Sequence, residues 1–317
     1  MRYLLCLLPL SLYGKFWIFS IVYNGPEYIP LQYKTLKYFL QDDFEYIVCD
    51  DSNQPSISAQ IAALCDHLKI QRLSIPQEIH RDTRWTSVLH AEVLDYMMRY
   101  LATEHPQDKV ILLQPDVFFH RPLSLKEELQ EFGFSAVHMN QIWQHSISPA
   151  AFLASGHPIG PLVTHFILDT ECWYPDTPFV YLDLSQFPHP EEMSWLPAIV
   201  EQGITDAGGL VPAHIHTYNI PYKLYPRVYC SEDALYQTIK PKHLEDTELQ
   251  CMVQTDAIDE VQKIADFAFH YTDSSNWTKR SRDFHQHKYQ SIYHLVQLVM
   301  EAYRPKKTID PVPSLIP

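Results

Sequence analysis

Glycine is scarce in this sequence, which has only 8 glycines among 317 residues. So few glycines argue against a glycine-rich phosphate loop as the main binding device. The sequence also lacks a P-loop, a nucleophile elbow and an HExxH pattern. These absences argue against the enzyme classes that such motifs mark.

Positive charge is also in short supply. The 24 Lys and Arg residues are outnumbered by 38 Asp and Glu residues, so the formal net charge is -14. The sequence has no long basic run, and an acidic surface repels the phosphate backbone of nucleic acids. We therefore expect no nucleic-acid partner.

Closely spaced cysteines are missing, since the six cysteines form no CxxC pair and no zinc-like spacing. Reduced, mostly buried thiols are the favoured interpretation, and they indicate a reducing compartment. The even number of cysteines keeps an exported protein open as the alternative. The cysteines are Cys6, Cys49, Cys65, Cys172, Cys230 and Cys251.

A long hydrophobic run is missing as well. Met1–Tyr13 is apolar, but it is interrupted by Pro9 and is too short to span a membrane as a helix. A signal-peptide core or a weak membrane anchor stays open beside a packed or nonessential start of the chain. A cytoplasmic location is favoured, and a membrane-associated or exported protein is left open.

The length and a hydrophobic share of 46% allow one large domain or two modest ones. Near residue 140 the composition changes, because Pro, His, Trp and Tyr become dense. We predict an apolar extension over residues 1–15, a first half over 16–139, a second half with a terminal helix over 140–304, and a tail over 305–317.

The first half alternates strand-like and helix-like segments. Apolar and β-rich runs predict strands at 16–23, 44–49, 71–75 and 110–113, and helical spacing predicts helices at 27–40, 56–68 and after residue 85. Such alternation is typical of a doubly wound α/β sheet. Farther along, the patterns predict helices at 123–132, 256–265 and 281–303 and strands at 134–138, 180–184 and 210–211.

Acidic residues follow two of the predicted strands. Asp50 and Asp51 come after the second strand, and Asp116 comes after the strand at 110–113. Ligands of open α/β sheets bind beyond the carboxyl ends of the strands, so these carboxylates are candidates for chemistry. The alternative is that Asp116 stabilises a turn and that Asp50 and Asp51 cap the next helix.

Two of these stretches resemble one enzyme family. LLQPDVFFHRP, residues 112–122, resembles the DxD region of GT-A nucleotide-sugar-dependent glycosyltransferases, and YIVCDDSN, residues 46–53, resembles the end of their second strand. The resemblance implies a GT-A-like, Rossmann-type mixed sheet, with Asp116 as a metal ligand and Asp50 and Asp51 at the base or ribose of the donor. The first acid of DxD is replaced by Gln114, which the resemblance places near the ribose.

A third stretch extends the resemblance. FAFHYTDSSNWTK, residues 267–279, resembles the late HYTG-x-x-KPW element of glycogenin-type transferases, although Asp273 and Asn276 replace the Gly and the Lys. The resemblance implies that His270 completes the coordination of Mn²⁺ or Mg²⁺. It also implies a nucleotide-sugar donor, bound by residues 16–139, and a glycan, lipid or protein acceptor, bound by the second half.

Two arginines and one further carboxylate complete the candidate set. Arg81 and Arg84 precede the third predicted helix. A helix N-terminus together with guanidinium groups suits the binding of a diphosphate. The alternative is that the arginines belong to a surface loop and pair with Asp82. Asp206 lies in an aromatic and histidine-rich segment, residues 203–226, of a kind that suits sugars. Asp206 is our candidate general base for an inverting mechanism.

Two pairs of histidines were also considered as metal ligands. His214 and His216, like His285 and His287, are two residues apart and would share a side if they lay on strands. With 17 histidines in the chain, such pairs also arise by chance.

The sequence therefore predicts a metal-dependent glycosyltransferase. Two alternatives remain: a degenerate GT-A-fold protein that binds a nucleotide or glycan without turnover, and a metal-dependent hydrolase that uses Asp50, Asp51 and Asp116.

Overall fold

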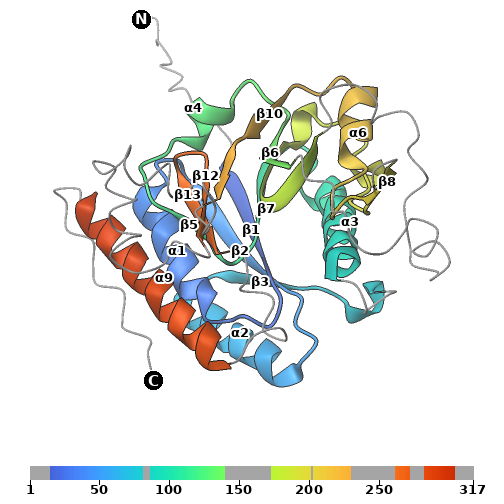
Figure 1. The fold of residues 1–317 in the computed structure, drawn as a ribbon. Helices are drawn as coiled ribbons and strands as arrows, with labels where there is room; N and C mark the ends of the chain where they lie inside the picture. Colours follow the sequence, from blue (N-terminus) through green and yellow to red (C-terminus); the bar gives the residue numbers. More distant parts are fainter. Residues whose placement is uncertain are drawn as a thin grey trace, which may run out of the picture.

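The structure is a computed structural model that describes residues 15–80, 86–139, 173–200, 203–229, 261–271 and 282–303. Its centre is a seven-stranded sheet with the strand order β10-β6-β7-β4-β1-β2-β3. Figure 1 shows this sheet between helices that cover its two faces. Its strands are β1 (Phe16–Val22), β2 (Phe44–Asp50), β3 (Gln71–Ser74), β4 (Lys109–Leu113), β6 (Phe134–Met139), β7 (Tyr174–Asp183) and β10 (Tyr222–Tyr225).

The sheet is mixed. β1 runs parallel to β2 and β4, and β2 runs parallel to β3, as the alternation of strands and helices predicted. β7 is antiparallel to both β4 and β6, while β10 is parallel to β6. The predicted fold class, an α/β, GT-A-like mixed sheet flanked by helices, is confirmed by this arrangement.

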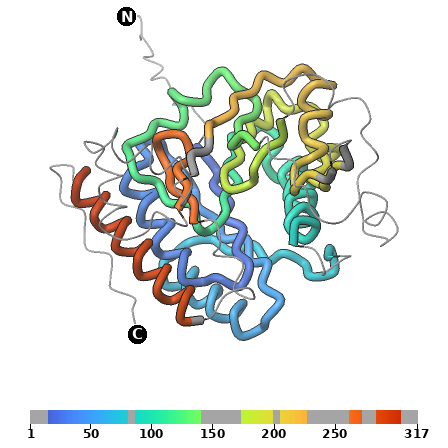
Figure 2. The backbone as a smooth tube through the Cα atoms, in the orientation of Figure 1, coloured from blue at the N-terminus to red at the C-terminus, as the bar shows by residue number. Residues whose placement is uncertain are grey.

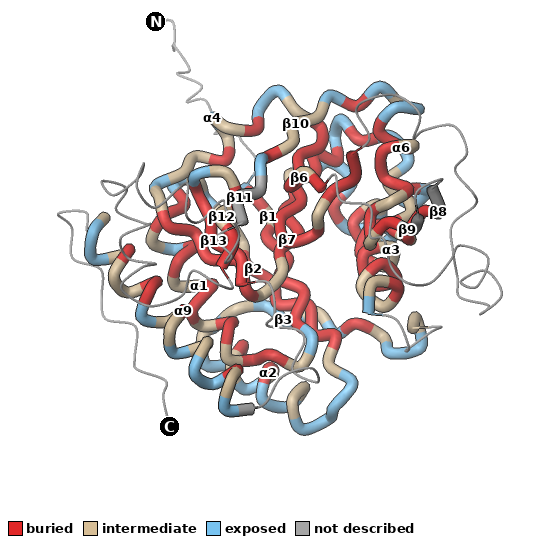
Figure 3. The backbone as a smooth tube through the Cα atoms, in the orientation of Figure 1, coloured by how far each residue is buried: buried red, intermediate tan, exposed pale blue. Residues whose placement is uncertain are grey.

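Two apolar cores lie on the two faces of the sheet. Along β4, Ile111 and Leu113 belong to one core and Val110 and Leu112 to the other, because successive side chains of a strand point to opposite faces. All four side chains are buried, which explains why β4 is apolar throughout. Figure 3 shows the buried backbone concentrated in these central strands.

The helices divide between the two faces. α1 (Tyr28–Phe39), α2 (Pro55–Leu68) and α9 (Arg282–Ala302) contribute to the core that holds Ile111, and α3 (Thr86–Glu104) and α6 (Val211–Thr217) contribute to the other. In Figure 1 the first three helices lie together on one side of the sheet and the last two on the opposite side. The other helical segments within the described ranges are α4 (Leu125–Leu129), η1 (Gln77–Ile79), η2 (Leu184–Gln186) and η3 (Pro190–Glu192).

A second, four-stranded sheet has the order β11-β12-β13-β5. Its strands are β11 (Arg227–Tyr229), β12 (Val261–Ile264), β13 (Ala268–Tyr271) and β5 (Val117–Phe119), and a separate hairpin consists of β8 (Ile199–Val200) and β9 (Gly203–Ile204). β5 follows β4 after a short turn and pairs with β13, so the end of β4 meets a segment from far along the chain (Figure 2).

Two predictions about secondary structure are wrong. Val211 begins α6 instead of forming a strand, and Pro212 at the start of that helix suits its first turn. Residues 261–264, predicted as the end of a helix, form β12 because they pair with β13 on one side and β11 on the other. Residues 256–260 of that prediction lie outside the described residues.

Several other predictions fall partly or wholly outside the described residues, namely Arg81, Arg84, residues 1–14 and residues 305–317. Cys49 and Cys65 are free and buried, as expected, and the other four cysteines also lie outside. In the part of the chain that the structure describes, no helix is both long and apolar enough to cross a membrane. The predicted division near residue 140 stays a prediction.

Candidate functional site

Asp116 lies in a tight turn between β4 and β5. The amide of Val117 donates to the carbonyl of Gln114 at 3.3 Å, which closes a turn with Pro115 in its second position, where the fixed φ of proline is favoured. The carbonyl of Asp116 accepts a hydrogen bond of 3.0 Å from the amide of Tyr271 in β13. The carboxylate is buried, with the residue only 2% exposed.

His270 reaches this turn through the pairing of two short strands. It lies opposite Val117 in the register of β13 and β5. As a result, Nε2 of His270 is 3.7 Å from Oδ1 of Asp116 and 3.1 Å from Oε1 of Gln114. The two stretches that resemble glycosyltransferase motifs therefore place Gln114, Asp116 and His270 side by side.

Gln114 has a defined role at the position where the family motif carries an acid. Its Nε2 donates to Oγ1 of Thr177 in β7 at 2.9 Å, which directs its Oε1 toward the imidazole of His270. The amide therefore links β7 to β13 across the end of β4. The sequence does not predict these two contacts, since its resemblance to the family places Gln114 near the ribose of the donor.

The imidazole of His270 lies between two amide side chains. Its Nδ1 is 3.4 Å from Oε1 of Gln262 in β12, on the side opposite Gln114. Both ring nitrogens thus face an amide oxygen, but a neutral imidazole has one N–H and donates to only one of them. In the tautomer that is protonated on Nδ1, the proton points toward Gln262 and Nε2 presents its lone pair beside the Asp116 carboxylate, as a metal ligand requires. In the other tautomer, Nε2 donates to Oε1 of Gln114 instead.

These donors fit a divalent cation. Carboxylate and amide oxygens suit Mn²⁺ and Mg²⁺, and an imidazole nitrogen is accepted by Mn²⁺ among other transition metals. The 3.7 Å between Nε2 of His270 and Oδ1 of Asp116 is too long for a hydrogen bond. It lies within the roughly 3 to 4 Å that separates two ligand atoms held at about 2.1 Å from one ion.

Asp50 is engaged in structural contacts. Its Oδ2 accepts hydrogen bonds from Arg72 at 2.6 Å and from Ser58 at 2.7 Å, and its Oδ1 accepts from the amide of Ser52 at 3.0 Å. Burial by itself raises the pKa of Asp50, but the hydrogen bonds from Ser58, Ser52 and Arg72 outweigh it, so the pKa is lowered. Asp50 therefore ties α2 to β3 through Ser58 and Arg72, whereas the N-cap of α2 is Gln54 with no side-chain cap. A contact of Asp50 with the donor stays a prediction.

Asp51 belongs to a buried chain of polar side chains that the sequence did not reveal. Its Oδ1 is 2.8 Å from Nε2 of His80, whose Nδ1 is 3.7 Å from Oε2 of Glu92 in α3. Burial raises the pKa of Asp51, and the hydrogen bond to Asp51 raises the pKa of His80. This chain links the end of β2 to α3 beside the predicted nucleotide site.

Glu27 and Tyr28, at the start of α1, are further polar residues near Asp116. Among the described residues, neither Oε1 of Glu27 nor the hydroxyl of Tyr28 has a hydrogen-bond partner, and both atoms are buried. Burial raises the pKa of Glu27 to about 7. Burial also raises the pKa of Tyr28, and the charges of Glu27 and Asp116 add to that effect. Both residues come shortly after β1 along the chain.

Asp206 lies apart from these contacts. Its Oδ1 accepts a hydrogen bond of 2.7 Å from the amide of Ala207, and none of the contacts described for it joins it to Asp116 or His270. The charge of Asp206 acts on His90 in α3, whose pKa is lowered to about 4 by burial against the opposing effect of that charge. The role of Asp206 as a general base stays a prediction.

The two histidine pairs lack the shared side that a metal site on a strand would need. Both lie on helices, where residues two apart point in nearly opposite directions because each residue turns the helix by about 100°. His214 instead stacks on Phe187 with ring centroids 5.2 Å apart. His285 is fully buried in α9, where it contacts Phe284.

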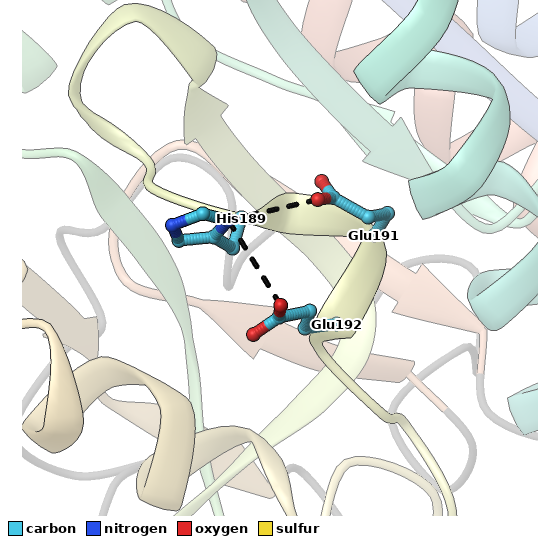
Figure 4. A group of neighbouring side chains, drawn as sticks. All are labelled: His189, Glu191 and Glu192. Carbon is cyan, nitrogen blue, oxygen red and sulfur yellow. Dashed lines mark ion pairs between the residues drawn. The ribbon is translucent and has the colours of Figure 1, made fainter.

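An exposed cluster of ligand-type side chains lies elsewhere on the surface (Figure 4). Nδ1 of His189 is 3.7 Å from a carboxylate oxygen of Glu191 and 3.9 Å from one of Glu192. Exposed acidic groups often gather in this way without binding an ion, so we assign no site to these three residues.

Comparisons with known proteins give limited information. No protein-family model matches the sequence, and no curated protein matches it. Among solved structures, the mannosyltransferase Ktr4p from S. cerevisiae is 14% identical over 56% of this chain and 58% of its own, with a TM-score of 0.34. The Mn/GDP form of core-mannan synthase A from Aspergillus fumigatus is 12% identical over 57% of this chain and 63% of its own, again with a TM-score of 0.34.

The matched region thus spans less than two thirds of either neighbour. At a TM-score of 0.34 the similarity to these two structures does not indicate an activity for this chain. The sequence motifs and the side-chain geometry are the basis for a functional proposal.

Proposed function

We propose that this protein is a GT-A-type glycosyltransferase that takes a sugar from a nucleotide-sugar donor with the help of Mn²⁺ or Mg²⁺. The observation that carries the proposal is the 3.7 Å approach of His270 Nε2 to Asp116 Oδ1. Each residue belongs to a different sequence motif, Asp116 to residues 112–122 and His270 to residues 267–279. A carboxylate and an imidazole, each a candidate ligand for a metal ion, thus lie beside each other.

The protein supplies the ligand atoms and keeps them in place. Asp116 offers a carboxylate oxygen from a turn that is fixed by the Tyr271 amide. His270 offers Nε2, while its protonated Nδ1 donates a hydrogen bond to Oε1 of Gln262. A divalent cation, when bound, neutralises negative charge on the departing nucleoside diphosphate.

The remaining roles of the site are proposed from the sequence motifs. Asp51 and Gln114 contact the base and ribose of the donor, and Arg81 and Arg84 meet its diphosphate. Asp206 accepts the proton of an acceptor hydroxyl, with the acceptor being a glycan, lipid or protein. In each case the residue type suits the task, since carboxylates and amides bind hydroxyl groups and guanidinium groups bind phosphates.

A degenerate transferase fold is the second candidate, and the contacts of Gln114 favour it. A neutral amide stands where the motif has an acid, and it already bonds both Thr177 and His270. Such a protein would bind the donor without transferring its sugar. The hydrolase alternative has less support, because Asp50 is bound by Arg72 and Asp51 by His80.

A thermal-shift screen tests the proposal. Nucleotide sugars are added with and without Mn²⁺, and at least one donor should raise the melting temperature only when Mn²⁺ is present. Asp116→Ala and His270→Ala should each remove that response. Glu191→Gln is the control, because it alters the exposed cluster of Figure 4 and should leave the response unchanged.

Two results separate the candidates. Donor hydrolysis in the presence of Mn²⁺ identifies an active transferase, while stabilisation without hydrolysis or transfer identifies a binding protein. The proposal is wrong if no nucleotide sugar stabilises the protein, or if Asp116→Ala responds like the wild type.

A further inference from the structure

A buried glutamine in α1 contacts the turn that carries Asp116. Gln32 is fully buried, and its Nε2 donates to the carbonyl of Gln114 at 2.6 Å and to the carbonyl of Val117 at 2.9 Å. These two carbonyls flank Pro115 and Asp116. One amide group therefore joins the beginning and the end of the turn from the side of α1.

The orientation of this amide is also fixed. The hydroxyl of Tyr46 in β2, itself buried, donates to Oε1 of Gln32 at 2.8 Å. Because both carbonyl partners can only accept and this hydroxyl donates, the amide group has one favourable orientation. A buried polar group that loses its hydrogen-bond partner destabilises the folded protein. The side-chain amide of Gln32 is therefore held in this position.

The turn is then held from two directions. Gln32 binds its carbonyls from α1, and the amide of Tyr271 binds the carbonyl of Asp116 from β13. The same β13 carries His270. The backbone of Asp116 is thereby fixed relative to the imidazole that lies 3.7 Å from its carboxylate.

We propose that Gln32 is a positioning residue that sets the Asp116 turn, with Tyr46 orienting its amide, and so governs the affinity of the Asp116–His270 pair for a divalent cation. This inference rests on the function proposed above. Gln32 does not touch the cation. Partners that orient metal ligands in this indirect way typically change metal affinity by about 10- to 100-fold when they are replaced.

Thr35 provides a matched control on the same helix. It lies one turn after Gln32. Its Oγ1 accepts a hydrogen bond of 3.3 Å from the amide of Phe119, farther along β5, and its hydroxyl donates to the backbone carbonyl of Gln32 at 2.9 Å within α1. Thr35→Val therefore removes a buried polar contact between α1 and β5 and a contact within α1, but it leaves the side-chain amide of Gln32 and its bonds to the turn in place. A general loosening of α1 should affect Thr35→Val and Gln32→Met alike, whereas positioning of Asp116 should affect only Gln32→Met.

The experiment measures binding of Mn²⁺ alone, by calorimetry or by the paramagnetic resonance of the free ion, on the full chain. We expect Gln32→Met to weaken Mn²⁺ binding by about 10-fold or more. Tyr46→Phe, which keeps the ring and is the milder change, should weaken binding in the same direction. Thr35→Val should bind Mn²⁺ like the wild type.

Amide hydrogen exchange gives a second readout that needs no metal. The amides of Val117 and Tyr271, which bond the turn, should exchange faster in Gln32→Met and Tyr46→Phe but not in Thr35→Val. Wild-type Mn²⁺ affinity in both Gln32→Met and Tyr46→Phe would overturn the inference. If the wild type does not bind Mn²⁺, the proposed function fails, and hydrogen exchange then decides the positioning role: unchanged exchange overturns it and faster exchange supports it.

Discussion

Oε1 of Gln114 lies 3.1 Å from Nε2 of His270. This contact occupies the nitrogen that faces the Asp116 carboxylate, so a cation and the Gln114 amide compete for the same atom of His270. The substitution of the first motif acid by glutamine therefore has a structural consequence beyond the loss of one charge.

Gln114→Glu tests this competition. A carboxylate at this position adds negative charge beside Asp116, but it also favours the protonated imidazole of His270. We expect Mn²⁺ binding to strengthen at pH 8 and to weaken at pH 6 relative to the wild type, which calorimetric titrations at both pH values can measure. If the pH dependence of Mn²⁺ binding is the same in Gln114→Glu and the wild type, the residue at position 114 does not affect whether His270 is protonated.

Asp50→Asn should destabilise the protein. The substitution removes the charge partner of Arg72 at the buried end of β2, and because Arg72 is partly exposed we expect a loss of about 1–3 kcal/mol. Urea unfolding at pH 7 measures this loss. Lys15→Ala, which breaks an exposed ion pair with Glu45, is the control and should cost less than about 0.5 kcal/mol.

The pH dependence of the Asp50 contribution has a defined sign. Because the folded-state pKa of Asp50 is lowered from 3.8, its stabilisation is present above that pH and is lost as the pH falls through the folded value. The stability difference between wild type and Asp50→Asn should therefore shrink in acid. A constant difference down to pH 2 would contradict this account.

His80 should contribute stability that declines as the pH rises. The hydrogen bond to Asp51 raises the pKa of His80 above 6.5, so its contribution is complete below pH 6.5 and is lost as the pH rises through the folded value. We expect His80→Gln to remove this decline, as judged from urea unfolding between pH 5.5 and pH 9. His67→Gln, at an exposed position, should retain it.

Glu27→Gln should stabilise the protein above neutral pH. Burial raises the pKa of Glu27 from 4.5 to about 7, so the wild type loses stability as the pH rises through this interval and the carboxyl group ionises. The uncharged variant avoids this loss and should gain about 2 kcal/mol at pH 8, allowing for partial exposure of the group.

Below pH 4.5 the wild type and Glu27→Gln should be nearly equal in stability. Thermal or urea unfolding at pH 4.5 and pH 8 checks both expectations. Glu78→Gln removes a carboxylate at an exposed position and should change stability little at either pH. A variant Glu27→Gln that is less stable than wild type at pH 8 would indicate that the ionised carboxylate has a favourable partner.

Much of the first half of the fold could be predicted because its signals are local. The apolar run of β4 is covered on both faces, and the helical spacing of Ile57, Ile61, Leu64 and Leu68 corresponds to α2. The secondary structure of the second half is harder to predict from the sequence. Residues 261–264 were assigned to a helix because a four-residue strand such as β12 carries too little periodicity to be recognised without its partners.

The candidate site was predicted only in part. The motifs selected Asp116 and His270, and the structure brings them together. The residues that support them, Gln32, Gln262 and Thr177, belong to α1, β12 and β7 and have no motif of their own. Nothing in the sequence distinguishes Asp50 from Asp51, and only the tertiary structure shows that Asp50 pairs with Arg72.

The sequence by itself determined the order of strands and helices in the first half and the acidic ends of β2 and β4, because side-chain periodicity and turn residues act over a few neighbouring positions. Only the tertiary structure decided which polar groups meet. β5 and β13 are three and four residues long, and their pairing across nearly half of the chain places His270 beside Asp116. That pairing depends on the packing of the whole domain, which no local pattern records.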